Sequence, residues 1–513
     1  MTRIGRRDMM RSGAGAMAAL LGISPLRART AAMRNALPLT DNGSLDVRTL
    51  IGGDGDISQA LLVARNANLN IWLSRGDYVL TGAFDQRDMR IAAARNAQIS
   101  AAGNDGRIFF SNGGFHQLPQ LASNIGTGAK RVRFSAPHGL KPGDWFIIYN
   151  PTDFSWHTAR AYYRAGEWCR VAAVTAQSVT LYSPLTSNYE TASVDIYHVS
   201  LRRPSISGGQ WDCGQRTLAD YSGCTGPLID VGRVTARANT AININRCVAA
   251  SLGCREGNNA GDGRDDYLIA IGNSQHIRVS GGVLFSRRHP VAIGGADLVC
   301  GVPNRDCRIQ NTTLRNDPDT NVMCADMHGN SENCGYDNCV ITGGGSMGGA
   351  SPYYRRCSIS ARRDGTVLEA TELVGGRIEI ADTKMFTPAY QIGGGRGLID
   401  LGSQNASLNH GTRMNMTVMV NNFAVDAPNL GRDEAIIRLD NNGSNVRIDM
   451  SVKNGSLRLR NPVQLVRAQL LSGRDESSSI TISDISGLPP GSKAYVPVNG
   501  AYLHGYRSIR VTE

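Results

Sequence analysis

A short phrase that recurs in the second half of this chain constrains its fold more than any other feature. The phrase has one or two polar residues, a Cys or Ile, one further residue, and then a β-branched or small residue. Repetition at an interval of this size is typical of stacked structural units. The marked positions are 30, 30, 32, 18 and 21 residues apart: Cys247, Ile277, Cys307, Cys339, Cys357 and Ile378.

The side chains within each unit alternate with a period of two, which is the pattern of a β-strand. The intervals between the phrases are too short and too rich in glycine to hold helices. The fold that is left is a solenoid of strands, in which each coil buries its apolar face against its neighbours. We therefore predict an all-β parallel β-helix, a fold that has no single core to outgrow at 513 residues.

The cysteines of the repeat fall at its inward position. We predict that Cys247, Ile277, Cys307, Cys339 and Cys357 form one buried column and that their thiols behave as small apolar side chains. The total of eleven Cys is odd, so at least one thiol is free. Closely spaced Cys or Cys/His pairs that suit a tetrahedral metal site are missing, so we predict no metal and no cofactor. Loop disulfides remain an alternative for Cys213 with Cys224, and for Cys300 with Cys324 or Cys334.

Residues 1–32 have the order of a bacterial export signal. Arg6 and Arg7 precede a modest apolar run at 16–23, and small residues follow around 30–32. The adjacent arginines make the segment resemble the twin-arginine type. The apolar run is short for a membrane span. We therefore expect a periplasmic or secreted protein without stable membrane insertion.

The net charge of +11 shrinks once the signal is set aside. Residues 1–32 carry six Arg and one Asp, so the remainder has a charge of +6. Dispersed charge of this size, without a recognition motif, argues against nucleic acid as a partner. Arginine pairs such as Arg287-Arg288 suit carboxylates on an acidic polymer, because guanidinium binds carboxylate in a bidentate way.

The first half of the chain has two further elements. Asp56 and Gln59 form a capping box, and the residues up to about Asn68 continue as a helix. Strand-like runs between 126 and 200 break the coil pattern and predict a small inserted β subdomain. Its aromatic residues include Trp156 and Trp168, whose faces suit sugar rings if they are exposed.

Residues 50–82, with their helix, strand, glycine turn and tyrosine strand, resemble the start of pectate-lyase-like superfamily members. That resemblance implies a right-handed parallel β-helix whose N-terminal helix caps the open end of the column. We divide the chain into an export signal at 1–32, the cap and first coils at 33–125, the inserted subdomain at 126–200, the parallel β-helix at 201–485 and a C-terminal cap at 486–513.

The residues with catalytic potential lie between 262 and 372. Successive coils stack about 4.8 Å apart, so residues some 30 positions apart become lateral neighbours. His289 and the group from Asp326 to Glu332 are about one coil apart, which lets a His, an Arg and carboxylates converge. We predict His289, His328, Glu332, Asp326 and Arg288 as catalytic residues. We predict substrate-binding roles for Arg287, Tyr336, Glu372, Asp265, Asp266, Trp156 and Trp168.

Two family resemblances bear on this region. The segment with His328, Glu332, Cys334 and Glu372 resembles phage tailspikes and secreted depolymerases of the pectate-lyase-like superfamily. Asp265-Asp266 and the run from His289 to Gly294 resemble the paired Asp and Gly-His-Gly motifs of polygalacturonases, although Pro290 replaces the second glycine. The resemblances imply an enzyme that cleaves a complex, acidic polysaccharide, as a monomer or a homotrimer.

Two mechanisms fit the residues. In β-elimination, His289 or His328 removes the proton next to a uronate carboxylate, Arg288 binds that carboxylate and Tyr336 acts as the acid. In hydrolysis, two carboxylates flank the glycosidic bond. We favour a polysaccharide lyase over a glycoside hydrolase. A sugar-binding or adhesion protein without catalysis is the third reading.

Overall fold

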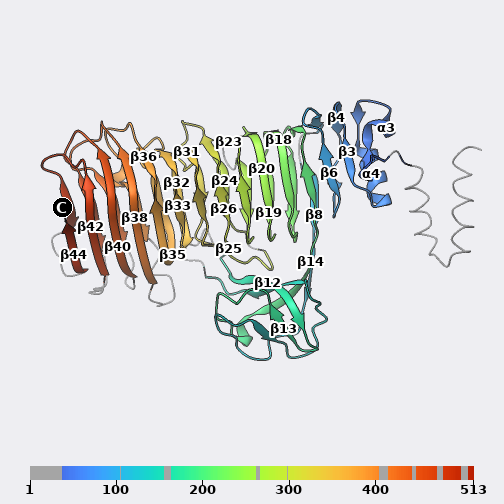
Figure 1. Cartoon of the computed structure of the whole chain (residues 1–513), viewed down its shortest axis with the longest axis horizontal. Coiled ribbons are helices and arrows are strands. Elements are labelled where there is room, and N and C mark those ends of the chain that lie inside the picture. The colour runs from blue at the N-terminus through green and yellow to red at the C-terminus, as the bar shows by residue number, and fades with distance from the viewer. Residues whose placement is uncertain are drawn as a thin grey trace, which may run out of the picture.

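The computed structural model describes residues 37–512, except 38, 104–105, 155–162, 262–265, 297, 404–413, 442–445, 471–477 and 498–505. The predicted export signal at 1–32 therefore lies outside the described residues. Strands run across a long column from the N-terminal end to the C-terminal end (Figure 1). Every named strand pairing in this column is parallel, which confirms the predicted parallel β-helix.

Each coil contributes strands to two sheets. One coil consists of β20 (Ser251–Asn259) in sheet A and β21 (Tyr267–Gly272) in sheet B. The next coil has β22 (Arg278–Ser280) and β23 (Val283–Ser286) in sheet A and β24 (His289–Gly294) in sheet B. β23 pairs with β20, and β24 pairs with β21. Alternate side chains point inward, and they form one continuous apolar core along the column.

The coils nearest the N-terminus follow two short helices, α3 (Val47–Ile51) and α4 (Ser58–Ala67). The buried face of α4 consists of Ala60, Leu61, Ala64 and Ala67, and it packs into the same core as the strands. The N-cap of α4 is Ile57, not Asp56, although Asp56 accepts a hydrogen bond from the Ser58 backbone N–H at 2.8 Å. The helix therefore begins one residue later than a box with Asp56 as N-cap predicts, and it ends at Ala67, next to the predicted end at Asn68.

The inserted β subdomain is confirmed as an antiparallel sheet with an apolar core of its own. Its six strands are β9 (Gly114–Gln117), β10 (Arg131–Arg133), β11 (Trp145–Asn150), β12 (Ala165–Val174), β13 (Ser178–Leu181) and β14 (Asp195–Ser200). They lie in the order β10-β13-β12-β11-β14-β9. The subdomain lies beside the column near β25 (Asn304–Arg305), as Figure 1 shows. A second apolar cluster joins the two parts, with Ile147, Tyr149 and Trp168 against Val248 and Val302.

Tight turns between strands rely on residues in the left-handed conformation. Asn311, Asn338, Arg356, Asp382 and Asn422 occupy the same place in successive coils, and each has a φ between 49° and 53°. Asn tolerates this conformation better than most residues because its short side chain bonds locally. The Asn338 amide also donates to the Asn311 side chain at 2.7 Å.

The prediction of a single cysteine column is wrong. All eleven thiols are free and buried, but register divides them among several columns. Cys307 lies above Ile277 and below Cys334, whereas Cys339 stacks with Cys357 and Cys247 with Cys224. The same phrase occurs at more than one corner of the coil, because each tight corner needs a left-handed residue followed by a small inward one.

Candidate active site

The outward face of sheet B brings together polar side chains from four successive coils. β24 carries His289, β28 (Ala325–Met327) carries Asp326, β32 (Gly345–Ala350) carries Ser346, and β35 (Leu368–Ala381) carries Glu372. Parallel pairing aligns these strands, with Ala292 opposite Asp326 and Gly348 opposite Glu372. Residues more than 80 positions apart in sequence therefore share one surface.

One carboxylate lies between two imidazoles. Oδ2 of Asp326 is 2.9 Å from Nε2 of His328 and 3.7 Å from Nε2 of His289. Oδ1 of Asp326 accepts a hydrogen bond from the Ser346 hydroxyl at 3.1 Å. This side-chain placement was predicted in outline, since His289 and His328 were expected on one face.

His328 also faces a second carboxylate. Its Nδ1 is 3.5 Å from Oε2 of Glu372, and that oxygen accepts hydrogen bonds from the Gly329 N–H at 2.6 Å and the Tyr163 hydroxyl at 2.8 Å. The imidazole lies over Gly294, where an added Cβ would come within 2.9 Å of the ring. Tyr163 belongs to the inserted subdomain, so the insert contributes directly to this site.

The two imidazoles have opposite protonation tendencies. Burial alone would lower the pKa of His328, but Asp326 and Glu372 outweigh it and raise the pKa to about 10. Burial lowers the pKa of His289, and Asp326 only partly offsets that effect. Burial would raise the pKa of Asp326, yet both imidazoles hold it well below its usual range. At neutral pH a neutral imidazole and an imidazolium thus flank a carboxylate.

His289 has a defined tautomer. Its Nδ1 lies 2.6 Å from the Met323 carbonyl, which can only accept, so Nδ1 carries the proton and Nε2 is the basic atom. Tyr267 stacks on the ring at a centroid distance of 5.5 Å, and the Arg288 guanidinium lies 5.7 Å from the Tyr267 centroid. These contacts hold the imidazole with Nε2 directed toward Asp326.

Three residues predicted to bind substrate are buried instead. Tyr336 lies wholly inside the coil, where it stacks on Tyr354 and donates to the Asp326 carbonyl at 3.2 Å. Trp168 packs at the junction between the insert and the column. The Asp266 side chain is fully buried, and its carbonyl accepts from the His289 N–H. The prediction that these residues contact a polymer is wrong, because their position turns them inward.

Glu332 forms an ion pair with an arginine and not with the two imidazoles. Its Oε2 accepts from Nε of Arg305 at 2.6 Å, and Nη1 of Arg305 lies 3.4 Å from Glu167 of the insert. Within the described residues the structure gives Glu332 no bond to His289 or His328. Arg287 donates to the Gly261 carbonyl at 2.8 Å. The predicted substrate contacts Asp265 and Trp156 lie outside the described residues.

Sequence reasoning missed a column of polar and charged residues that continues from Asp326. Ser346, Glu369, Asp400 and Arg438 follow it on successive coils of sheet B. The signal was available, since each charged residue stands between two apolar ones, as in Leu368-Glu369-Ala370 and Ile399-Asp400-Leu401. Burial, aided by Glu369, raises the pKa of Asp400 to about 6 despite the Arg438 guanidinium.

Arginines surround this column. Arg362 binds Glu369 at 2.6 Å and Asp364 at 2.6 Å, and Arg396 lies 3.2 Å from Glu369.

Among the described residues no group of three or more His, Cys, Asp or Glu side chains is arranged to hold a metal ion. None of the helices in that part of the chain has the length and hydrophobicity needed to cross a membrane.

The stacked coils, with parallel pairing throughout the column, define a protein with a pectate-lyase-like β-helix fold. Residues 236–474 match the family model described as Gp49, pectin lyase-like, and residues 110–199 match the model of the tailspike protein-like Ig-like domain. The chain therefore has the pectate-lyase-like parallel β-helix fold and is similar to tailspike proteins in both the column and the insert.

Solved tailspike structures are similar over most of the chain. The tailspike gp49 of Pseudomonas phage LKA1 shares 29% identity at a TM-score of 0.81, over 88% of this chain and 77% of that one. The tailspike gp61 of Pseudomonas phage phi297 shares 24% identity at a TM-score of 0.73, with the same coverages. The Gp54 tailspike of Acinetobacter baumannii bacteriophage AP22, solved with a capsular saccharide, shares 18% identity at 0.70, over 91% and 81%. No curated protein matches this chain in sequence.

Proposed function

We propose that this protein cleaves the glycosidic bonds of a complex, acidic bacterial polysaccharide by β-elimination. The observation that carries the proposal is the pair of imidazoles with opposite protonation beside Asp326. β-Elimination needs a base and an acid within reach of one sugar linkage, together with a cation near the uronate carboxylate. In this proposal His289, His328 and Arg288 fill the three roles.

The reaction assigns a role to each group. The neutral Nε2 of His289 takes the proton on the carbon next to the uronate carboxylate. The electron pair of that C–H bond forms a carbon–carbon double bond as the bond to the leaving oxygen breaks. The His328 imidazolium gives its proton to that oxygen, which replaces Tyr336 as the proposed acid. Arg288 neutralises the uronate carboxylate, and Asp326 positions both imidazoles.

Hydrolysis at a neighbouring carboxylate pair is the second candidate. Glu369 and Asp400 are direct partners on adjacent coils, so their strands are about 4.8 Å apart. Carboxyl groups about 5 Å apart suit a retaining glycosidase, in which one is the nucleophile and the other the acid. The pKa of about 6 at Asp400 suits the acid. The ion pairs of Arg362 and Arg396 with Glu369 oppose this reading, because they occupy the nucleophile.

A panel of bacterial exopolysaccharides tests the proposal. Elimination predicts ultraviolet absorbance from unsaturated uronates together with new reducing ends, whereas hydrolysis predicts reducing ends alone. His289→Ala and His328→Ala should each lower turnover by about 10²- to 10⁴-fold with folding intact, as loss of a general acid or base does. Glu369→Gln is the matched control and should cleave normally. Binding without any cleavage would support an adhesion or binding protein.

We further propose that residues 1–32 direct the protein out of the cytoplasm by a twin-arginine route, with polysaccharide as its partner outside. The supporting observation is the Arg6-Arg7 pair ahead of an apolar run. Replacing both arginines with Lys should leave unprocessed precursor in the cytoplasm, while the purified protein without the segment stays active. Normal processing of that variant would contradict the twin-arginine route.

A further inference from the structure

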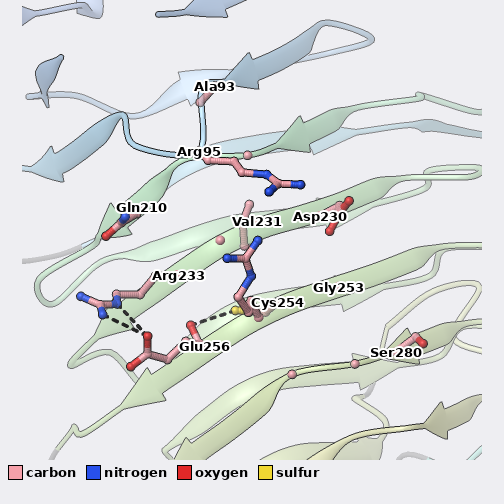
Figure 2. Close-up of a pocket in the computed structure, with 15 residues that line it drawn as sticks. Ala93, Arg95, Gln210, Asp230, Val231, Arg233, Gly253, Cys254, Glu256 and Ser280 are labelled. Carbon is pink, nitrogen blue, oxygen red and sulfur yellow. Dashed lines mark hydrogen bonds and ion pairs between the residues drawn. The ribbon is translucent and has the colours of Figure 1, made fainter. Parts of the chain in front are cut away.

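A hollow of about 670 Å³ opens on sheet A (Figure 2). His289, by contrast, lies on β24 of sheet B. The hollow lies where β18 (Leu228–Ala236) and β20 (Ser251–Asn259) turn between their two segments. β18 turns at Gly232, the hollow is lined by further glycines, and neighbouring backbones approach closely. An added Cβ would come within 1.9 Å of the Ala93 carbonyl at Gly208 and within 1.8 Å of the Cys254 carbonyl at Gly282. Glycine at these two positions therefore lets adjacent coils pack closely beneath the hollow.

Charged side chains surround this space. Arg95, Arg233 and Arg255 line it together with Asp230 and Glu256. Figure 2 shows Arg233 turned toward Glu256, and the two form an ion pair at 3.0 Å. Arg95 and Arg255 are exposed, and among the described residues neither is paired with a carboxylate. Two guanidinium groups are therefore available to a ligand.

We propose that this hollow is a non-catalytic subsite for an acidic sugar residue of a polysaccharide. Guanidinium groups bind carboxylates in a bidentate way, and the nearby Gln210 and Ser280 side chains can bond to hydroxyls. Asp230 and Glu256 would repel a ligand with dense negative charge, such as a polyphosphate. They accept hydrogen bonds from hydroxyls, so the lining suits a hydroxyl-rich ligand with few carboxylates.

The hollow continues along the column. A neighbouring hollow of about 380 Å³ shares Gln210 and Arg233 with it and extends to Asp77, Gln98 and Asp212. Together they form a groove that crosses several coils. A groove of this kind binds a chain of sugar units and not a single compact molecule. The class of polymer is inferred from the proposed function. The place where the polymer binds is inferred from the residues of sheet A alone.

The proposal is tested by isothermal titration calorimetry with trigalacturonate as the acidic probe and maltotriose as the neutral one. Trigalacturonate should bind the full chain, and maltotriose should not. The Arg95→Gln/Arg255→Gln double variant should lose about tenfold in affinity or more, equivalent to about 1.4 kcal/mol. Arg133→Gln, an exposed arginine of the insert, is the matched control and should bind normally.

The outcomes separate this subsite from the proposed active site. Binding that survives in the arginine double variant, or that disappears in a His289→Ala/His328→Ala double variant, would overturn the subsite. Equal binding of maltotriose, or failure of trigalacturonate to bind, would overturn its assignment to acidic sugars. Intact, arginine-dependent binding by a protein that cleaves no polymer would instead contradict the proposed function and leave the subsite standing.

Discussion

The Asp326 carboxylate determines how the two imidazoles beside it titrate. Its negative charge stabilises the protonated form of both His289 and His328. His328 has a second carboxylate, Glu372, within 3.5 Å, whereas His289 has the Arg288 guanidinium nearby. Two chemically identical side chains therefore differ in charge at neutral pH because their neighbours differ.

The pH dependence of turnover should follow from this difference. Elimination needs a neutral His289, so the rate rises with pH through a pKa below the usual value of 6.5. It also needs a protonated His328, so the rate falls as pH rises through about 10. Asp326→Asn removes the charge that raises both pKa values and should move both limbs of the kcat profile to lower pH. Asp319→Asn, at an exposed carboxylate, should move neither limb; unshifted limbs in Asp326→Asn would refute the assignment.

At the scale of elements, a hydrogen bond links the inserted subdomain to the candidate active site on the column. The Tyr163 hydroxyl donates to the same Glu372 oxygen that faces His328. Loss of this bond leaves more negative charge on that oxygen, so the Glu372 carboxylate stabilises the His328 imidazolium more strongly. Tyr163→Phe should therefore raise the pKa of His328 and shift the alkaline limb of the kcat profile to higher pH, with little change in the melting temperature. Tyr182→Phe, at an exposed tyrosine of the insert, is the control.

The left-handed turn residues make a separate stability prediction. Asn338 has a φ of 52°, a conformation that costs a residue with a plain Cβ about 1–2 kcal/mol. Asn338→Ala should lower the free energy of unfolding by about that amount. Asn338→Gly accepts the same φ and loses only the exposed amide bond to Asn311. Equal urea midpoints for the two variants would show that backbone strain at this turn is unimportant.

Across the whole molecule, the cysteines test the core. All eleven thiols are free and buried, and burial raises the pKa of Cys213 and Cys324. In the native protein, almost none of the eleven thiols should therefore react with a thiol reagent. After denaturation without a reductant, all eleven should react. Fewer than eleven thiols after denaturation would reveal disulfides and contradict the structure.

The sequence predicts the coil but not its corners. Alternation and repetition suffice for the β-helix, because both arise from strands that stack in register. The repeated phrase does not identify which corner it occupies, so Cys247 and Ile277 seemed equivalent although they lie in different columns. Likewise, spacing brought His289 near His328, but the contact of Tyr163 with Glu372 joins residues 209 positions apart. No local pattern encodes a contact of that kind.

The fate of water tests the central claim most directly. We would digest a polysaccharide substrate in ¹⁸O-labelled water and determine the masses of the products. Elimination by His289 and His328 adds no water across the glycosidic bond. Every new non-reducing end should therefore carry an unsaturated ring, and cleavage should incorporate no ¹⁸O into the freshly released products. Products heavier by one labelled water, with saturated ends, would contradict the account and place the reaction at Glu369 and Asp400.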